Sequence, residues 1–414
     1  MQSKILTDRQ TYRQTDSIPP IVNSLTGWRF IMVITIAVSH LEFLGAAEGE
    51  HANLYDFFFH NARMGVSFFF ILSGFGLTYS FLRKPYSEQH EILSQHWSLL
   101  SGIKFAMNRV SRLYKWYLIT MALFIPVDLV NMLDYRNLSG AIKIIGFKAV
   151  MSIGLVQSIF AQIRFSHSFN AVCWFLSTLF ILYIFYPLIQ RCNMRIVNKA
   201  YEKRNVFTIK LCLLFIFSIY IIIHLLFSIV ADRTSFTDLA YGSPYIRVFD
   251  FIIGMLICDL SICQRHISWW NKSVFSILEV IISSAFVLWF FLRNAICYGE
   301  KGPYGIYEET KNLVDICIVC VLIYIFSYEA GVVSKFMKKS FMVKLGGVAM
   351  YIFLAHYPVR IISYRLLTMK FDETLGLKIL ELIITIFGTA VAVYYMRRFD
   401  KNRTIRRKGF ESKI

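Results

Sequence analysis

The sequence predicts an all-α polytopic membrane protein with about ten transmembrane helices and both termini in the cytoplasm. Hydrophobic residues make up 56% of the 414 residues and charged residues only 17%, and apolar segments long enough to cross a bilayer recur along the chain. The net charge of +18 comes from basic residues that cluster in alternate loops. This alternation follows the positive-inside rule, so it indicates membrane orientation and predicts no nucleic-acid partner.

Polar or basic segments flank the predicted membrane domain. Residues 1–24 form a cytoplasmic segment without a cleavable signal peptide, so the first span is expected to act as the insertion signal. Residues 25–396 form the ten-helix domain, and residues 397–414 form a basic cytoplasmic tail. The predicted spans cover about residues 26–44, 64–82, 113–131, 174–190, 208–230, 245–261, 273–292, 312–330, 346–366 and 376–396.

One further apolar stretch, residues 142–161, is excluded from the count of spans. It contains Lys143, Lys148 and Gln157, and a span here would break the charge alternation downstream. We interpret it as an interfacial or re-entrant segment on the outer side. Because an irregular backbone at that depth needs protein or water around it, the segment is expected to help roof a cavity.

The first predicted helix, residues 25–44, carries Arg29 and His40 within an otherwise apolar sequence. Eleven residues separate them, which brings both side chains onto one helical face, roughly 16 Å apart. Ionisable groups within a membrane span are rare and usually functional. The pattern predicts a track along which a long, thin substrate lies.

His40 is the candidate catalytic residue. A neutral imidazole can take a proton from a hydroxyl group or act as a nucleophile, and burial favours the neutral form. A histidine that is merely hydrogen-bonded within the helix packing is the alternative.

Two segments between the first and fourth spans carry polar residues that can contact a ligand. Ser73 lies in the glycine-rich stretch Gly65–Leu77, where a narrow ligand seat and plain helix packing are both possible. Arg109 and Arg112 share a helical face, so they can clamp a phosphate or serve as a positive-inside anchor.

Polar residues also mark three later spans. Asn170, Trp174 and Ser177 are spaced to share one helical face at the start of the fourth span, where Trp174 can also be an interfacial residue. Arg247 enters the sixth span three residues before an aspartate, which favours a local ion pair. His356, in the ninth span, is a second intramembrane histidine and a candidate for substrate positioning.

Four of these motifs, in this order, resemble the membrane acyltransferase-3 family. The matching elements are the Arg, ten residues, His pattern at Arg29 and His40, the glycine-rich signature at Gly65 to Phe75, the R-x-x-R motif at Arg109 and Arg112, and the block from Tyr351 to Pro358. The resemblance covers roughly Leu25 to Met396. The chain departs from it in having Leu179 where many members have glutamate, and no proline after the R-x-x-R motif.

The resemblance implies an integral-membrane acyltransferase of the bacterial cytoplasmic (inner) membrane. It would move an acyl group, expected to be acetyl, from acyl-CoA to a hydroxyl of a surface polysaccharide or exopolysaccharide or its lipid-linked precursor. Expected partners are these two substrates and membrane lipid, with no tightly bound cofactor and no metal. His40 would be catalytic, and the substrate-binding candidates are Arg29, Ser73, Arg109, Arg112, Asn170, Trp174, Ser177, Arg247 and His356.

Within this scheme the arginines Arg29, Arg109 and Arg112 would hold the donor phosphates. Ser73, Asn170 or Ser177 would steady the developing oxyanion. Two other functions stay open at this stage. One is a transporter or flippase of a polysaccharide or lipid-linked sugar, with His40, Arg29 and His356 as a proton relay. The other is a membrane anchor within a polysaccharide-synthesis complex.

Overall fold

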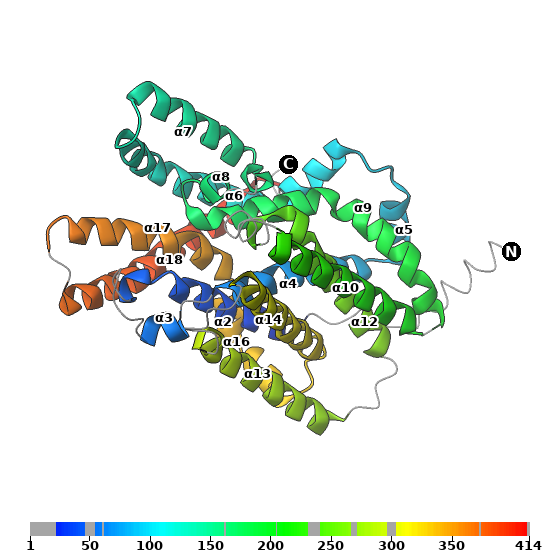
Figure 1. Ribbon diagram of the computed structural model, residues 1–414. Coiled ribbons are helices and arrows are strands. Elements are labelled where there is room, and N and C mark those ends of the chain that lie inside the picture. Colours follow the sequence, from blue (N-terminus) through cyan, green and yellow to red (C-terminus); the bar gives the residue numbers. More distant parts are fainter. Residues whose placement is uncertain are drawn as a thin grey trace.

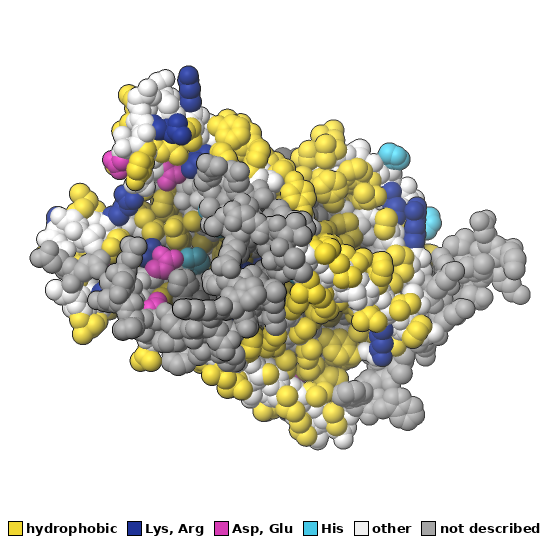
Figure 2. All heavy atoms as spheres, in the orientation of Figure 1, with side chains coloured by type: hydrophobic (Ala, Val, Ile, Leu, Met, Phe, Trp, Pro, Cys, Tyr) yellow, Lys and Arg dark blue, Asp and Glu magenta, His cyan; other side chains and the backbone are white. Residues whose placement is uncertain are grey.

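The computed structural model describes residues 22–45, 54–59, 62–160, 163–203, 205–230, 241–265, 271–295, 304–371 and 374–411. All regular secondary structure within these ranges is helical, as the sequence predicts. Figure 1 shows long helices that lie side by side, with α7 and the end of α6 projecting from the body. Hydrophobic side chains cover much of the visible surface in Figure 2, as expected for a protein surrounded by lipid.

Each predicted span falls on a helix. These helices are α2 (Ser24–Ser39), α4 (Arg63–Leu82), α6 (Leu99–Leu133), α9 (Trp174–Lys203), α10 (Phe207–Val230), α12 (Pro244–Arg265), α13 (Lys272–Ala295), α14 (Tyr304–Phe326), α17 (Ala349–Thr368) and α18 (Leu375–Glu411). Shorter helices are α3 (Leu54–Phe58), α5 (Tyr86–Ser94), α7 (Leu138–Ile153), α8 (Ile163–Ser166), α15 (Val332–Met337) and α16 (Ser340–Gly346). Three short 3₁₀ helices, η1 (Glu42–Leu44), η2 (Gln157–Ile159) and η3 (Ala171–Cys173), complete the described set.

Six described helices are long and apolar enough to cross a membrane on their own, namely α4, α6, α9, α10, α13 and α18. A seventh span is formed if α16 and α17, bent by 55° at the break between them, count as one. Helix α2 falls short because its 16 residues extend only about 24 Å. The protein is therefore a multi-pass membrane protein, whereas the count of ten and the sides of the termini stay predictions.

Helix α4 lies at the centre of the core and is mostly buried. Its close approach to α12 depends on two glycines. A Cβ atom on Gly74 would collide with the backbone oxygen of Phe251, and one on Gly254 would collide with that of Ile71. The predicted packing role is thus confirmed for Gly74. Gly76 is different, because a Cβ there would meet no atom within 4 Å.

Helix α2 is shorter than the sequence predicts, since it ends at Ser39 and not near Leu44. Two side chains bond the same carbonyl at its end: the Ser39 hydroxyl donates to Ile36 O at 2.8 Å, and His40 Nδ1 lies 2.8 Å from that oxygen. Polar side chains that take over terminal carbonyls compete with further helical turns. His40 is therefore the C-cap residue of α2, outside its regular turns.

The stretch 142–161 forms most of α7 and the turn after it. Helix α7 packs on the second half of α6, and the chain then reverses at Leu155, which has a positive φ of 54°. The Tyr117 hydroxyl on α6 donates to Ser152 O at 2.7 Å, which fixes this reversal against the bundle. The position of this hairpin relative to the membrane stays a prediction.

We predict that Gly254→Ala lowers the free energy of unfolding by about 1–3 kcal/mol, because the added methyl group forces α12 away from α4. Gly146→Ala is the matched control. Gly146 is exposed on α7 with no neighbour within 4 Å of a new Cβ, so the exchange should be neutral or stabilising. Thermal unfolding followed by size-exclusion fluorescence compares the two variants. Equal melting temperatures would show that the α4–α12 contact tolerates side chains.

Candidate active site

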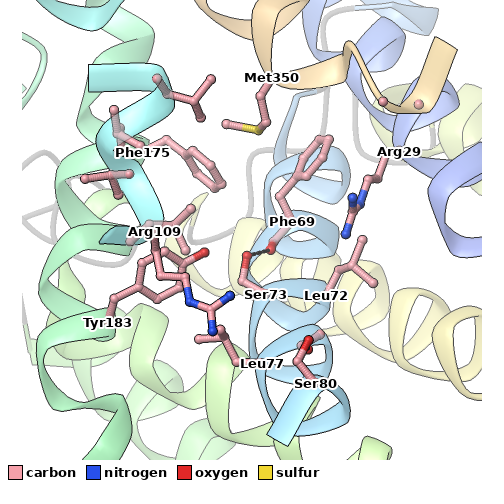
Figure 3. A pocket seen from close by; sticks show the side chains of 17 residues that line it. Arg29, Phe69, Leu72, Ser73, Leu77, Ser80, Arg109, Phe175, Tyr183 and Met350 are labelled. Atoms are coloured by element: carbon pink, nitrogen blue, oxygen red, sulfur yellow. Dashed lines mark hydrogen bonds between the residues drawn. The ribbon is translucent and has the colours of Figure 1, made fainter. Parts of the chain in front are cut away.

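A cavity of about 340 Å³ lies between α2, α4, α6 and α9. Its lining includes three residues predicted to bind substrate, Arg29, Ser73 and Arg109. Figure 3 shows the two guanidinium groups pointing into the cavity from opposite sides, with the Ser73 hydroxyl between them. Ser73 donates its hydroxyl to Phe69 O at 2.6 Å. The space beside Gly76, also in the lining, keeps this part of the cavity wide.

The cavity is suited to an anionic ligand. No carboxylate of the described residues lies within ion-pair distance of Arg29 or Arg109. Arg29 is half-buried, whereas Arg109 is exposed at the open end. A guanidinium withdrawn from water without a counter-ion is unfavourable, so an entering phosphate would be stabilised there. Arg112 is exposed one turn beyond Arg109 but does not line the cavity, so the facing pair is Arg29 and Arg109.

The other end of the cavity is closed by apolar side chains. Phe69, Phe175 and Met350 line it there. The ring of Phe175 lies 5.1 Å from that of Phe353, and the ring of Phe353 lies 6.0 Å from that of His356. A single aromatic layer therefore separates the cavity from the histidines described next.

His40 and His356 form a hydrogen-bonded pair. His356 Nε2 lies 3.3 Å from His40 Nδ1, and the ring centroids are 5.1 Å apart. Each Nδ1 also lies near a backbone carbonyl, at 2.8 Å for His40 to Ile36 O and 3.0 Å for His356 to Ile352 O. Because a carbonyl can only accept, both rings carry their proton on Nδ1.

This tautomer assigns the roles of the remaining nitrogens. His40 Nδ1–H is shared between Ile36 O and His356 Nε2, so the basic lone pair of His40 is on Nε2. His356 is buried, with 3% exposure, and His40 is half-buried. His356 Nε2 thus accepts a hydrogen bond from His40 Nδ1–H and helps to orient the imidazole of His40.

The predicted continuous track from Arg29 to His40 is not present. Arg29 lines the cavity, but His40 does not. Between them on the same face of α2 lie Val33 and Ile36, which are fully packed in the core. The aromatic layer and these core residues divide the path between the two groups. The reason is that the helix ends before His40, which turns toward α17.

Asn170 supports the backbone of α17 next to His356. Pro358 lies inside α17 and has no N–H group, so the carbonyl of Leu354, four residues earlier, loses its usual helical partner. The side-chain Nδ2 of Asn170 donates to Leu354 O at 3.2 Å. Asn170 is fully buried. The predicted substrate-binding residue thus holds the backbone two residues before His356.

Three other candidates are engaged elsewhere in the fold. The Ser177 hydroxyl donates to Leu155 O at 2.8 Å and holds the turn after α7. Trp174 is buried, and its ring lies 4.9 Å from Tyr241. Arg247 forms the expected ion pair with Asp250, at 2.6 Å, within the α4–α12 packing. None of these three residues lines the cavity.

A third histidine, His167, is the residue that the sequence reasoning missed. It lies in the loop before α9, where its Nδ1 is 2.8 Å from the Ser166 hydroxyl and its ring is 5.8 Å from that of Trp174. Burial, with a smaller effect of a charge on His40, lowers the pKa of His167 to about 4. His167 is therefore neutral at physiological pH. Nothing in its local sequence distinguishes it from an ordinary loop histidine.

Apolar helices long enough to cross a membrane, a cavity lined by two arginines and a histidine pair beyond its apolar end are compatible with a membrane-bound acyltransferase. Comparison with known families agrees, because the chain matches the family model described as an acyltransferase domain over residues 22–398. The protein belongs to the acyltransferase-3 family, as its motifs predict. No curated protein and no solved structure matches it.

We predict that Asn170→Ala lowers the free energy of unfolding by about 1–3 kcal/mol, because Leu354 O is left buried without a donor. Pro358→Ala restores a backbone N–H four residues after that carbonyl. Combining the two exchanges should therefore recover part of the loss, which a double-mutant cycle of chemical denaturation measures. Strictly additive effects would show that Asn170 does not replace the donor missing at Pro358.

Proposed function

We propose that this membrane acyltransferase moves an acyl group from acyl-CoA to a hydroxyl group of a glycan, with His40 as the base. The observation that carries the proposal is the hydrogen bond between His40 Nδ1 and His356 Nε2, which fixes the orientation of the His40 imidazole. The acyltransferase family match favours this function over transport.

The donor would enter by the open end of the cavity. Arg109 and Arg29 would hold phosphates of coenzyme A, with Arg112 on the exposed approach. The pantetheine arm, long and thin, would run past Ser73 toward Phe175 and Met350. This orientation brings the thioester to the aromatic layer in front of His356.

The aromatic layer would have to open for transfer. Phe175 belongs to α9 and Phe353 to α17, and both rings would have to move to join the cavity to the histidine pair. In its closed form the layer keeps water away from the thioester. An enzyme that separates its donor from solvent until the acceptor is bound limits wasteful hydrolysis.

The chemistry at His40 is a balanced acyl transfer. The acceptor oxygen attacks the thioester carbonyl while His40 Nε2 takes the hydroxyl proton. The C–S bond then breaks, and the coenzyme A thiolate takes the proton from the imidazolium. While His40 is charged, its Nδ1–H continues to donate to His356 Nε2 and Ile36 O, which stabilises the cation. If His40 instead accepts the acyl group itself, the same Nε2 is the nucleophile.

The finer details of the substrates rest on the family resemblance. On that basis we propose acetyl as the acyl group and a surface polysaccharide, exopolysaccharide or lipid-linked precursor as the acceptor. Membrane lipid would be the remaining partner, and the location would be the bacterial cytoplasmic membrane. Mass spectrometry of surface glycans from cells with and without the protein identifies the acyl group and the acceptor together.

We predict that His40→Ala abolishes transfer, with a loss of at least about 100-fold in kcat, because general-base catalysis contributes roughly 10²–10⁴-fold. His356→Asn should lower kcat less, since an amide can still accept from His40 Nδ1. His96→Ala, at an exposed residue far from the pair in sequence, is the control. Radiolabelled acetyl transfer by purified, folded protein measures all three. Wild-type turnover by the His40→Ala variant would remove this residue from the mechanism.

We also predict that Arg109→Gln raises the KM for acetyl-CoA by about tenfold while kcat changes little, because a charge-assisted phosphate contact is lost far from the reacting atoms. Arg136→Gln, at an exposed arginine beyond the other end of α6, should leave KM unchanged. Steady-state kinetics with varied donor distinguishes the two. An unchanged KM for the Arg109 variant would place coenzyme A outside this cavity.

A further inference from the structure

A second pair of polar side chains lies directly beyond the histidine pair. Glu42 follows His40 by two residues and begins η1, and Arg360 follows His356 by one helical turn on α17. Arg360 Nη2 lies 3.3 Å from Glu42 Oε2. The same two chain segments therefore meet twice, once through imidazoles and once through opposite charges.

The surroundings of Arg360 leave part of its hydrogen-bonding capacity unused. Its side chain is 9% exposed and lies over the rings of Phe43 and Tyr364, at 5.9 and 5.7 Å from their centroids. The buried Nε has no hydrogen-bond partner among the described residues. An orphaned buried donor is costly unless a ligand or water satisfies it.

Glu42 is the exposed member of the Glu42–Arg360 pair. Its side chain is 49% exposed, in contrast to the buried Arg360. On the face shown in Figure 2, acidic, basic and histidine side chains gather in one recess near α17. A molecule in the surrounding solvent can therefore reach the carboxylate first and the guanidinium behind it.

Aromatic rings border the same place. Tyr357 lies on α17 between His356 and Arg360 in the sequence. Its ring meets that of His40 edge to face, with ring centroids 5.5 Å apart. The last turn of α2 is also held by Tyr55, whose hydroxyl donates to Val38 O at 3.0 Å. Aromatic faces beside a donor and an acceptor form an amphipathic surface that suits a sugar ring.

We propose that Glu42 and Arg360 form the acceptor subsite and bind a neutral sugar through two vicinal hydroxyls. One hydroxyl would donate to the Glu42 carboxylate and accept from Arg360, which places its neighbour at His40 Nε2 for acylation. The charges of Glu42 and Arg360 cancel, so the subsite gives an anionic sugar no net electrostatic attraction. An alkyl chain would remove water from both ions without replacing the lost hydrogen bonds, so it is disfavoured as well. This inference rests on the proposed function and names the class of its acceptor.

A matched pair of small acceptors tests the subsite. Trans-1,2-cyclohexanediol carries the second hydroxyl, whereas cyclohexanol lacks it. The assay uses purified full-length protein and radiolabelled acetyl-CoA. The kcat/KM of the wild type should be about tenfold higher for the diol than for cyclohexanol, which is the effect expected from one additional hydrogen bond. Glu42→Gln and Arg360→Lys should reduce this ratio to near one. Asp134→Asn, at an exposed carboxylate that caps α6, should preserve it.

The ratio separates a subsite from a purely structural ion pair. If the Glu42–Arg360 contact only held η1 against α17, both variants would lose activity equally toward the diol and the alcohol. An unchanged ratio in both variants would overturn the proposal. Failure of the wild type to acetylate any hydroxyl would instead overturn the proposed function.

A binding measurement without donor keeps the two proposals independent. Saturation-transfer NMR with methyl α-D-glucopyranoside should show contact with the wild type and at least a severalfold weaker signal with Glu42→Gln. His40→Ala, which lacks the base but keeps the subsite, should still bind the glucoside. Equal signals for the wild type and Glu42→Gln would exclude Glu42 from the acceptor site, whatever the outcome for transfer.

Discussion

The hydrogen bond between His40 and His356 is the contact on which the proposed chemistry depends. It joins residues 316 positions apart in the chain. His40 makes this contact from the C-cap position of α2, directly after the last helical residue, Ser39. At the end of α2 the side chains of Ser39 and His40 bond the carbonyl of Ile36, which a further helical turn would otherwise satisfy.

Several neighbouring contacts hold this pair in place. Asn170 donates to the Leu354 carbonyl that Pro358 leaves without a helical partner, two residues before His356. Beyond the pair, Arg360 and Glu42 join the same two segments. Each contact gives a buried polar group a hydrogen-bond or ion-pair partner. Such partners lower the free-energy cost of burying a polar cluster inside an apolar bundle.

Much of the fold was predictable because lipid imposes a strong pattern on sequence. Long apolar segments gave a helix at every expected position, and the glycine of α4 at position 74 packs as its small size suggests. The cavity residues Arg29, Ser73 and Arg109 were found because charged or polar groups are conspicuous in apolar helices. How many helices cross the bilayer depends on the membrane itself. Of the described helices, six are each long and apolar enough to cross it.

The remainder depends on contacts that no local pattern encodes. The apolar sequence continues past Ser39, so hydrophobicity could not predict the end of α2; the Ile36 carbonyl and its two side-chain donors decide it. Ser177 looked like a ligand-facing hydroxyl, but its partner lies in the turn after α7. The contact of Arg360 with Glu42 requires two distant segments to meet, which the sequence alone does not indicate.

In the proposed function, Phe175 and Phe353 separate the donor cavity from the His40–His356 pair. The most direct test of this arrangement is electron cryo-microscopy of the protein with a non-hydrolysable thioether analogue of acetyl-CoA. The account predicts phosphates beside Arg29 and Arg109, displaced rings of Phe353 and Phe175, and the analogue carbonyl within reach of His40 Nε2. Coenzyme A bound away from this cavity, or a carbonyl separated from His40 by intact core packing, would contradict it.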